Sequence, residues 1–197
     1  EPGWWRFDTP LPDNIHWLAT PPEDPDAWGA CLWITDRLLG DAEAAPWAGR
    51  LTRYRPRSLY LGVGCDRGAA RETVETAIDT ALTEAGLSPL AVGGMATIDK
   101  KQDEPALHEV SEARGWPLHF YPPEALAAVA DIPNPSETVQ RYMGTPAVGE
   151  PAALLAAGAE ADRLIVEKRK YCGADGKNAT VSIARAPFPE PGANQAS

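Results

Sequence analysis

The chain has 197 residues, of which 44% are hydrophobic and 23% charged, and its formal net charge is −10. This length suits one α/β domain with an additional segment, and the composition is that of a soluble globular protein. The negative charge argues against nucleic acid or an anionic membrane surface as a partner. Because the sequence has neither a basic leader nor an apolar run of the roughly 20 residues that a membrane span needs, we expect a cytoplasmic protein.

Cysteine and histidine residues are few and scattered. Their spacing fits neither a disulfide framework nor a Cys-type or His-type metal site, so we expect no metal and no cofactor. A reduced intracellular compartment is consistent with this cysteine usage. The residues are Cys31, Cys65, Cys172, His16, His108 and His119.

The first part of the chain, residues 1–50, is rich in Pro and Trp and carries nine acidic and three basic residues. It shows little periodicity, which predicts an irregular segment with one short strand at 31–35. Pro46, Gly49 and Pro56 indicate a linker over residues 41–57. The chain starts with Glu1 rather than Met, and we interpret residues 1–50 as part of a domain that is incomplete in this sequence.

Residues 51–186 alternate between strand-like and helix-like patterns. Strands are predicted at 59–63, 95–98, 116–121, 164–166 and 179–184, and helices at 74–85, 105–113, 124–129, 148–157 and from Asn134. Asp103 is predicted to cap the second helix, and a basic loop to join the last two strands. This order predicts a single three-layer α/β domain with a mixed sheet of about five strands, followed by a disordered tail at 187–197.

The stretch S-L-Y-L-G-V-G-C-D-R-G-A-A, residues 58–70, is the pattern of a buried strand, a glycine turn and a helix start. Gly62, Gly64 and Gly68 permit unusual φ values and a close approach of a ligand to the backbone. The first N–H groups of the helix can receive an anion. The third glycine of a dinucleotide fingerprint is missing, which disfavours a nucleotide, and such junctions also occur in α/β proteins that bind nothing there.

Two side chains in this turn suggest chemistry. Cys65 at a helix start beside Arg67 would have a lowered pKa and nucleophilic character, although a buried cysteine is usually only a small apolar residue. Arg67 is the better candidate, because a guanidinium beside free N–H groups suits capture of a carboxylate, with Asp66 orienting it.

Charged residues elsewhere extend this hypothesis. Asp99 and Glu104 follow a strand and form either an acid–base pair or a helix cap and an ion pair with the neighbouring lysines. Lys101 lies between them, and Lys168 leaves a later strand within a basic run, so both are candidates for binding a polyanionic small molecule. Glu150 lies in the first turn of a helix, where the helix dipole alone explains it.

Several motifs, taken together and in this order, resemble the C-terminal domain shared by the CbiG and CobE proteins of cobalamin biosynthesis. The resemblance covers residues 51–186, and Ile34–Arg37 with Tyr54–Leu59 resembles the segment that precedes this domain in CbiG proteins. Asp66 departs from the family pattern, where a second basic residue is frequent. The motifs are G-V-G-C-D-R-G at 62–68, A-T-I-D-K-K-Q-D-E at 96–104, P-S-E-T-V at 135–139, G-T-P-A-V-G-E at 144–150, E-K-R-K at 167–170 and A-T-V-S-I-A-R at 179–185.

The resemblance implies a function. CbiG is the cobalt-precorrin-5A hydrolase, which opens a ring-A lactone and releases acetaldehyde, whereas CobE is similar to an accessory protein that binds a tetrapyrrole. By this resemblance the substrate is an anionic tetrapyrrole, and other enzymes of the pathway are expected partners. Asp99 or Glu104 would act as the base. Gly64, Cys65, Arg67, Gly68, Lys101, Glu150 and Lys168 would contact the substrate. An unrelated α/β domain, in which these motifs are only turns and caps, is the remaining alternative.

Overall fold

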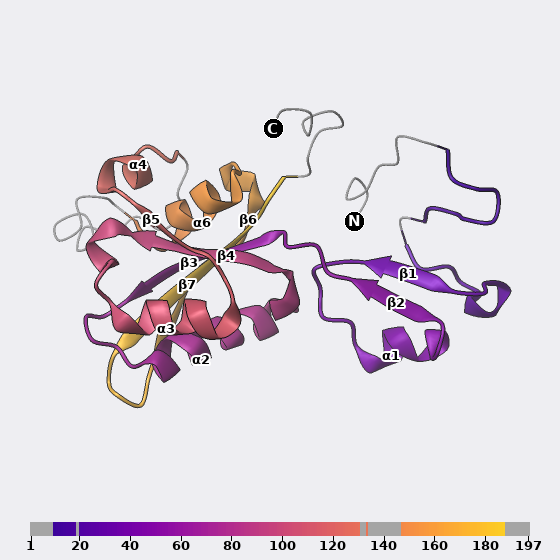
Figure 1. Cartoon of the computed structure of the whole chain (residues 1–197), viewed down its shortest axis with the longest axis horizontal. Helices are drawn as coiled ribbons and strands as arrows, with labels where there is room; N and C mark the ends of the chain where they lie inside the picture. Colours follow the sequence, from indigo (N-terminus) through magenta and orange to yellow (C-terminus); the bar gives the residue numbers. More distant parts are fainter. Residues whose placement is uncertain (1–9, 19, 131–132, 134–146, 188–197) are drawn as a thin grey trace.

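The computed structural model describes residues 10–18, 20–130, 133 and 147–187. Its centre is a mixed five-stranded sheet in the order β5-β4-β3-β7-β6 (Figure 1). β3, β4 and β5 are parallel, whereas β7 is antiparallel to both of its neighbours. The predicted mixed sheet is therefore confirmed. The strands are β3 (Leu59–Cys65), β4 (Val92–Ile98), β5 (Leu118–Tyr121), β6 (Leu164–Cys172) and β7 (Asn178–Arg185).

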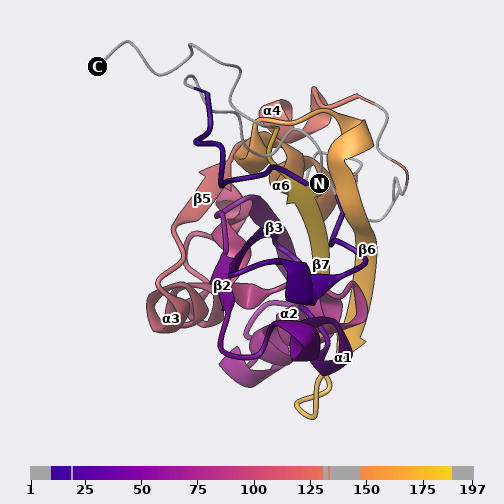
Figure 2. The same cartoon turned by 90° about the vertical axis from the view of Figure 1, so that its right-hand side faces the viewer.

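Helices cover both faces of this sheet and give the three predicted layers (Figure 2). α2 (Arg71–Glu84) and α3 (Pro105–Arg114) lie on one face, and α4 (Pro123–Ala127) and α6 (Gly149–Ala157) on the other. The apolar residues of α2 that follow helical spacing, including Val74, Ile78 and Leu82, are buried against the sheet. Gly115 ends α3 with a φ of 65°, the left-handed conformation that glycine favours at the end of a helix.

α6 approaches the sheet closely because β3 carries a glycine beneath it. A Cβ atom on Gly62 would lie 1.7 Å from the Gly149 carbonyl oxygen, so no other residue fits there while α6 keeps its place. The predicted role of Gly62, an unusual φ and a close approach of a ligand, is therefore wrong. The space above Gly62 is filled by the backbone of α6, and Gly62 and Gly64 do not have positive φ values.

The N-terminal part forms a small module beside the α/β domain, with a parallel pair of strands, β1 (Cys31–Ile34) and β2 (Leu51–Tyr54), and a short helix, α1 (Asp41–Ala44) (Figure 1). The strand predicted at 31–35 is confirmed, but the linker predicted over 41–57 contains α1 and β2. The residues of β2 do not alternate between apolar and polar side chains, so the sequence pattern does not indicate a strand there. Short 3-10 turns lie at Pro25–Ala27, Ala45–Trp47, Pro89–Ala91, Asp99–Lys101 and Ala161–Arg163.

A buried ion pair joins this module to the end of the sheet. Asp36 is 1% exposed, its Oδ2 lies 2.7 Å from Arg185 Nε, and Ser58 Oγ donates to the same oxygen at 3.2 Å. In the backbone, the Leu38 N–H donates a hydrogen bond to the Gly86 carbonyl, and the Ser88 N–H donates one to the Asp36 carbonyl. The segment that follows β1 is therefore fixed to the α/β domain by residues that lie as far as 149 positions away in the chain.

Two further predictions need correction. The basic run at 167–170 lies inside β6 and not in a loop, and the connection to β7 is only Gly173–Lys177. Asp103 does not cap α3, because its carboxylate pairs with Arg67 instead. The predicted helix start at Asn134 and the tail after Pro187 lie outside the described residues. None of the described helices is long and apolar enough to span a membrane.

Candidate functional site

The glycine turn lies between β3 and α2, where the carboxyl ends of the parallel strands meet. Gly68 has a φ of 68°, which glycine adopts without strain, and its N–H donates to Glu104 Oε1 at 2.7 Å. Glu104 comes from the loop between β4 and α3. The turn and this loop therefore form one structure, although 36 residues separate them in the sequence.

Beneath the turn, Lys101 and Glu104 form a buried ion pair. Lys101 Nζ lies 3.1 Å from Glu104 Oε2, and the two side chains are 6% and 1% exposed. Each oxygen of the Glu104 carboxylate thus has one donor, Lys101 for Oε2 and Gly68 for Oε1. These contacts offset part of the desolvation cost of a buried pair. Of the two alternatives left open by the sequence, the ion pair describes Glu104.

Arg67 lies next to this buried pair, and its side chain reaches solvent. Its side chain is 62% exposed, and Nη1 lies 2.6 Å from Asp103 Oδ2. Nη2 donates to the Lys100 carbonyl at 3.3 Å, and Nε lies 4.0 Å from Glu104 Oε2. The hydrogen bond from Arg67 lowers the pKa of Asp103. The guanidinium therefore lies above the buried pair and faces outward, as a carboxylate-binding group must.

Asp66 does not orient Arg67, contrary to expectation. Its Oδ2 accepts hydrogen bonds from the Asn178 amide at 2.8 Å and from Asn178 Nδ2 at 2.9 Å, and these bonds lower the pKa of Asp66. Asp66 therefore fixes the β6–β7 hairpin to the turn. Asp103, rather than Asp66, is the carboxylate that pairs with Arg67 and orients it.

The N-terminus of α2, predicted to receive an external anion, is capped by a carboxylate of the chain itself. Asp175 Oδ2 accepts from the Ala70 amide at 2.8 Å, and Oδ1 accepts from Thr73 Oγ1 at 2.9 Å. The backbone bonds to Ala70 and Lys177 are the largest causes that lower the pKa of Asp175. Asp175 was not among the predicted residues. The Asp-Gly pair at 175–176 is a hairpin signal, but no local pattern places it on α2.

Cys65 is a protonated thiol in this environment. Burial raises its pKa to about 11, and Lys101 opposes this only in part. The thiolate is the reactive form of cysteine, so Cys65 is not a nucleophile near neutral pH. The alternative that Cys65 has a lowered pKa is wrong, because desolvation outweighs the nearby cations.

Two oxygen atoms at the end of β4 are buried without a hydrogen-bond partner in the part of the chain that the structure describes. They are Thr97 Oγ1 and Asp99 Oδ1. Thr97 lies two residues after Met95 on β4, so its side chain lies on the α2 side of the sheet, whereas Asp99 begins the 3-10 turn that follows the strand. An unpaired buried acceptor is costly, so Asp99 Oδ1 is a candidate to accept a hydrogen bond from a bound water molecule.

The structure therefore brings six of the predicted residues together and separates three. Gly64, on the opposite face of β3, neighbours Thr180, and a Cβ on Gly64 would lie 2.7 Å from Thr180 Oγ1. Glu150 is buried in the first turn of α6, and Lys168 lies on the edge strand β6 beside the C-terminal half of α2. The six residues of the cluster are Cys65, Arg67, Gly68, Asp99, Lys101 and Glu104.

Comparison with known proteins identifies the family. A family model described as the C-terminus of cobalamin synthesis protein G matches residues 59–184. The chain belongs to this CbiG C-terminal family. The match covers the five-stranded sheet apart from Arg185, the last residue of β7, and it includes the cluster around Arg67.

Two curated relatives carry names from the same pathway. A cobalt-precorrin-5A hydrolase from Priestia megaterium is 35% identical over 189 residues, which are 95% of this chain and 48% of the hydrolase. Protein CobE from a Sinorhizobium species is 40% identical over 111 residues, 56% of this chain and 71% of CobE. The chain thus spans about half the length of the hydrolase that it matches.

A solved structure supports the fold. The crystal structure of CobE, described as a protein from the cobalamin biosynthetic pathway, superposes with a TM-score of 0.57 at 30% identity and covers 68% of this chain and 93% of CobE. Among the described residues of the CbiG C-terminal domain, no group of three or more His, Cys, Asp or Glu side chains is arranged to hold a metal ion.

Proposed function

We propose that this chain is part of a cobalt-precorrin-5A hydrolase, which opens the ring-A lactone of an anionic tetrapyrrole and releases acetaldehyde. The observation that supports this most is the extent of the match to the hydrolase. Only eight of the 197 residues lie outside it, so it includes most of the N-terminal module. The CobE structure covers 68% of the chain and 93% of itself, so about a third of this chain has no counterpart there.

Substrate recognition is assigned to the cluster around Arg67. A tetrapyrrole precursor carries acetate and propionate carboxylates, and a protein with a net charge of −10 needs local cations to bind it. Arg67 is exposed and already holds the Asp103 carboxylate at 2.6 Å, which is the geometry that a substrate carboxylate requires. Lys101 is assigned to holding the turn that carries Arg67 in place, because its charge is paired with Glu104 in the buried ion pair.

Lactone opening adds water to the lactone carbonyl and leaves a carboxylate and an alcohol, so it needs an activated water and a donor for the developing oxyanion. Release of acetaldehyde follows when a base takes the proton of that alcohol and the bond between the alcohol carbon and the ring breaks, with its electron pair left on the ring. We assign the base to Asp99, whose Oδ1 is buried without a partner in the described part of the chain. Glu104 is a positioning residue, because both of its oxygens accept hydrogen bonds from Lys101 and Gly68. The Gly68 N–H is engaged by Glu104 and the Arg67 guanidinium is assigned to a substrate carboxylate, so the oxyanion is assigned to neither of them.

The test measures acetaldehyde release from cobalt-precorrin-5A by the chain and by Asp99→Asn. We expect Asp99→Asn to lower the rate by about 100-fold or more, the usual contribution of a general base. Asp162→Asn is the matched control, since Asp162 is exposed in a 3-10 turn before β6 and its substitution should leave the rate unchanged. Full activity of the Asp99→Asn variant would show that Asp99 is not the base.

A tetrapyrrole-binding accessory function, which the resemblance to CobE implies, is the second candidate. The superposition of almost the whole of CobE on this chain favours it. Arg67→Gln should weaken tetrapyrrole binding about tenfold under either function, since both use the same charge-assisted contact. Binding without acetaldehyde release by the 197-residue chain would favour the accessory function, whereas release of one acetaldehyde per substrate opened supports the hydrolase.

A further inference from the structure

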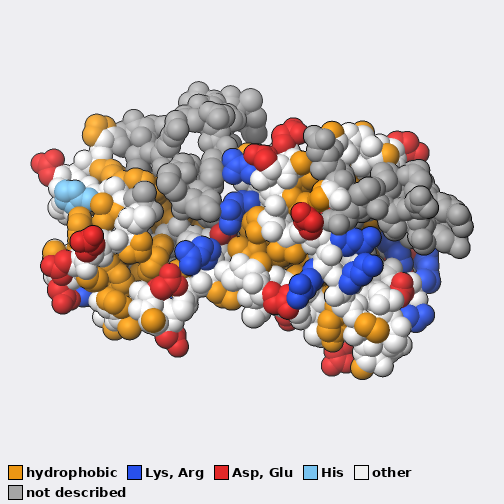
Figure 3. All heavy atoms as spheres, turned by 180° about the vertical axis from the view of Figure 1, so that it is seen from behind, with side chains coloured by type: hydrophobic (Ala, Val, Ile, Leu, Met, Phe, Trp, Pro, Cys, Tyr) orange, Lys and Arg blue, Asp and Glu red, His pale blue; other side chains and the backbone are white. Residues whose placement is uncertain are grey.

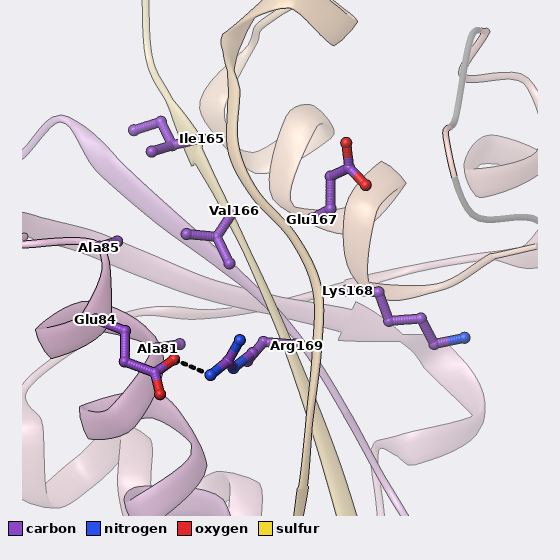
Figure 4. Close-up of a pocket in the computed structure, with 8 residues that line it drawn as sticks. All are labelled: Ala81, Glu84, Ala85, Ile165, Val166, Glu167, Lys168 and Arg169. Carbon is purple, nitrogen blue, oxygen red and sulfur yellow. Dashed lines mark ion pairs between the residues drawn. The ribbon is translucent and has the colours of Figure 1, made fainter.

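A pocket of about 420 Å³ lies on the side of the α/β domain that carries the edge strand β6 (Figure 4). It opens between the C-terminal half of α2 and the first half of β6. Figure 3 shows this face of the molecule, on which Lys and Arg side chains gather over the α/β domain. The residues that line the pocket are Ala81, Glu84, Ala85, Ile165, Val166, Glu167, Lys168 and Arg169.

The pocket has a local cause in both elements. β6 shifts its register against β7 twice, between Leu164 and Val166 and between Val166 and Arg169. Such bulges bend an edge strand and redirect its side chains, and here Ile165 and Val166 both pack against the core beside α2. Opposite them lie Ala81 of α2 and Ala85, the residue that follows α2, whose small side chains leave the space unfilled.

Four of the lining residues are apolar (Ala81, Ala85, Ile165 and Val166), and four are charged (Glu84, Glu167, Lys168 and Arg169). Arg169 Nη2 forms an ion pair with Glu84 Oε2, and the two side chains are 52% and 46% exposed. Figure 4 shows Arg169 and Glu84 pointing toward each other, whereas Lys168 points away from this pair. A guanidinium beside an apolar wall is the arrangement that recognises an apolar molecule with a carboxylate.

We propose that this pocket binds a small carboxylic acid with an apolar body. The apolar body packs on Ile165, Val166 and the two alanines opposite them, and the carboxylate replaces Glu84 on Arg169. The volume lies in the range of small-molecule sites, about 300–1,000 Å³. The chemistry follows from the complementarity of charge and apolar surface, and it involves no covalent step.

This site is separate from the cluster around Arg67. Ala81 lies ten residues after Arg71 along α2, which corresponds to about 15 Å at 1.5 Å per residue. A ligand in the pocket therefore does not touch Arg67 or Asp99. The proposal is independent of the proposed function, and either can fail without the other.

The test uses 4-phenylbutyrate as the acid and 4-phenylbutyramide as its uncharged counterpart, with binding to the 197-residue chain measured by calorimetry and by amide chemical shifts of α2 and β6. We expect the acid to bind more tightly than the amide. Arg169→Gln should weaken binding of the acid about five- to tenfold, because a charge-assisted contact is lost. Glu84→Gln should tighten it about two- to fivefold, since Arg169 is freed from its competitor.

Two further variants keep the test specific. Lys170→Gln changes the net charge as Arg169→Gln does, but Lys170 does not line the pocket and should leave the affinity unchanged. Ala85→Leu fills the pocket with apolar atoms and should abolish binding of both compounds, with folding checked by thermal unfolding. Equal affinity for the acid and the amide, equal losses in Arg169→Gln and Lys170→Gln, or weaker binding by Glu84→Gln would each overturn the proposal.

Discussion

Lys101 Nζ lies 3.1 Å from Glu104 Oε2, and both side chains are buried under the turn that joins β3 to α2. Lys101 and Glu104 are only three positions apart in the sequence. The pair nevertheless stabilises a contact between two loops at the edge of the sheet, because the other Glu104 oxygen accepts a hydrogen bond from the Gly68 N–H. The pair therefore fixes the loop after β4 to the turn after β3. Its stability decides whether Arg67 and Asp99 keep their relative positions.

Lys101→Met should destabilise the protein by about 3–5 kcal/mol, because Glu104 would remain as a buried charge without its cation. Urea unfolding followed by circular dichroism measures this change. The double variant Lys101→Met/Glu104→Leu should lose less than Lys101→Met alone, since neither charge is then buried. A loss below about 1 kcal/mol in Lys101→Met would mean that water reaches this pair.

Gly62→Ala should destabilise the fold by about 1–3 kcal/mol or more, because the added Cβ would lie 1.7 Å from the Gly149 carbonyl oxygen. α6 would have to move away from β3. Thermal unfolding measures the loss, and Gly29→Ala is the matched control, since a Cβ on Gly29 meets no atom within 4 Å. Equal stability of the two variants would contradict the close packing of α6 on Gly62.

Acid should weaken the contact between the β6–β7 hairpin and the turn. The pKa values of Asp66 and Asp175 are lowered by hydrogen bonds from backbone amides. A carboxyl group with a lower pKa in the folded state stabilises above its unfolded pKa, about 3.9, and loses this contribution as the pH falls through the folded pKa. Stability measured from pH 6 to pH 3 should therefore fall below about pH 4.

The variants Asp66→Asn and Asp175→Asn test the source of this pH dependence. Each removes one titrating group, so each should make the fall in stability shallower than in the unchanged protein. Asp13→Asn is a control, because Asp13 is exposed in the N-terminal module. Identical pH profiles for all four proteins would show that the hairpin contacts do not titrate.

Cys65 should react slowly with iodoacetamide near neutral pH, because burial raises its pKa to about 11. Cys172 is exposed and should be modified first. Mass spectrometry of digested protein, sampled over time at pH 7.5 and pH 10, follows both sites. Cys65→Ala should keep the activity of the chain. Modification of Cys65 as fast as Cys172 at pH 7.5 would contradict a protonated, buried thiol.

Much of the fold follows from local patterns in the sequence. The apolar spacing of α2, the glycines after α2 and α3, and the apolar runs of β3 and β4 are each set by residues within a few positions of one another. The motifs from Gly62 to Arg185 were also sufficient to indicate the family. The β2 strand and the length of β6 were not predictable, because polar edge strands lack alternation and are fixed by their neighbours in the sheet.

For the candidate site, the sequence by itself determined which residue types are present: an arginine in a glycine turn, and three carboxylates and two lysines after the next strand. Only the tertiary structure decided their pairing, because hydrogen bonds form between groups that folding brings within 3 Å, whatever their separation in the chain. Arg67 thus pairs with Asp103 and not with Asp66, and Asp175 caps a helix about 100 residues away. Burial decided the protonation state of Cys65, since desolvation raises the pKa of its thiol and keeps it protonated although two cations lie nearby.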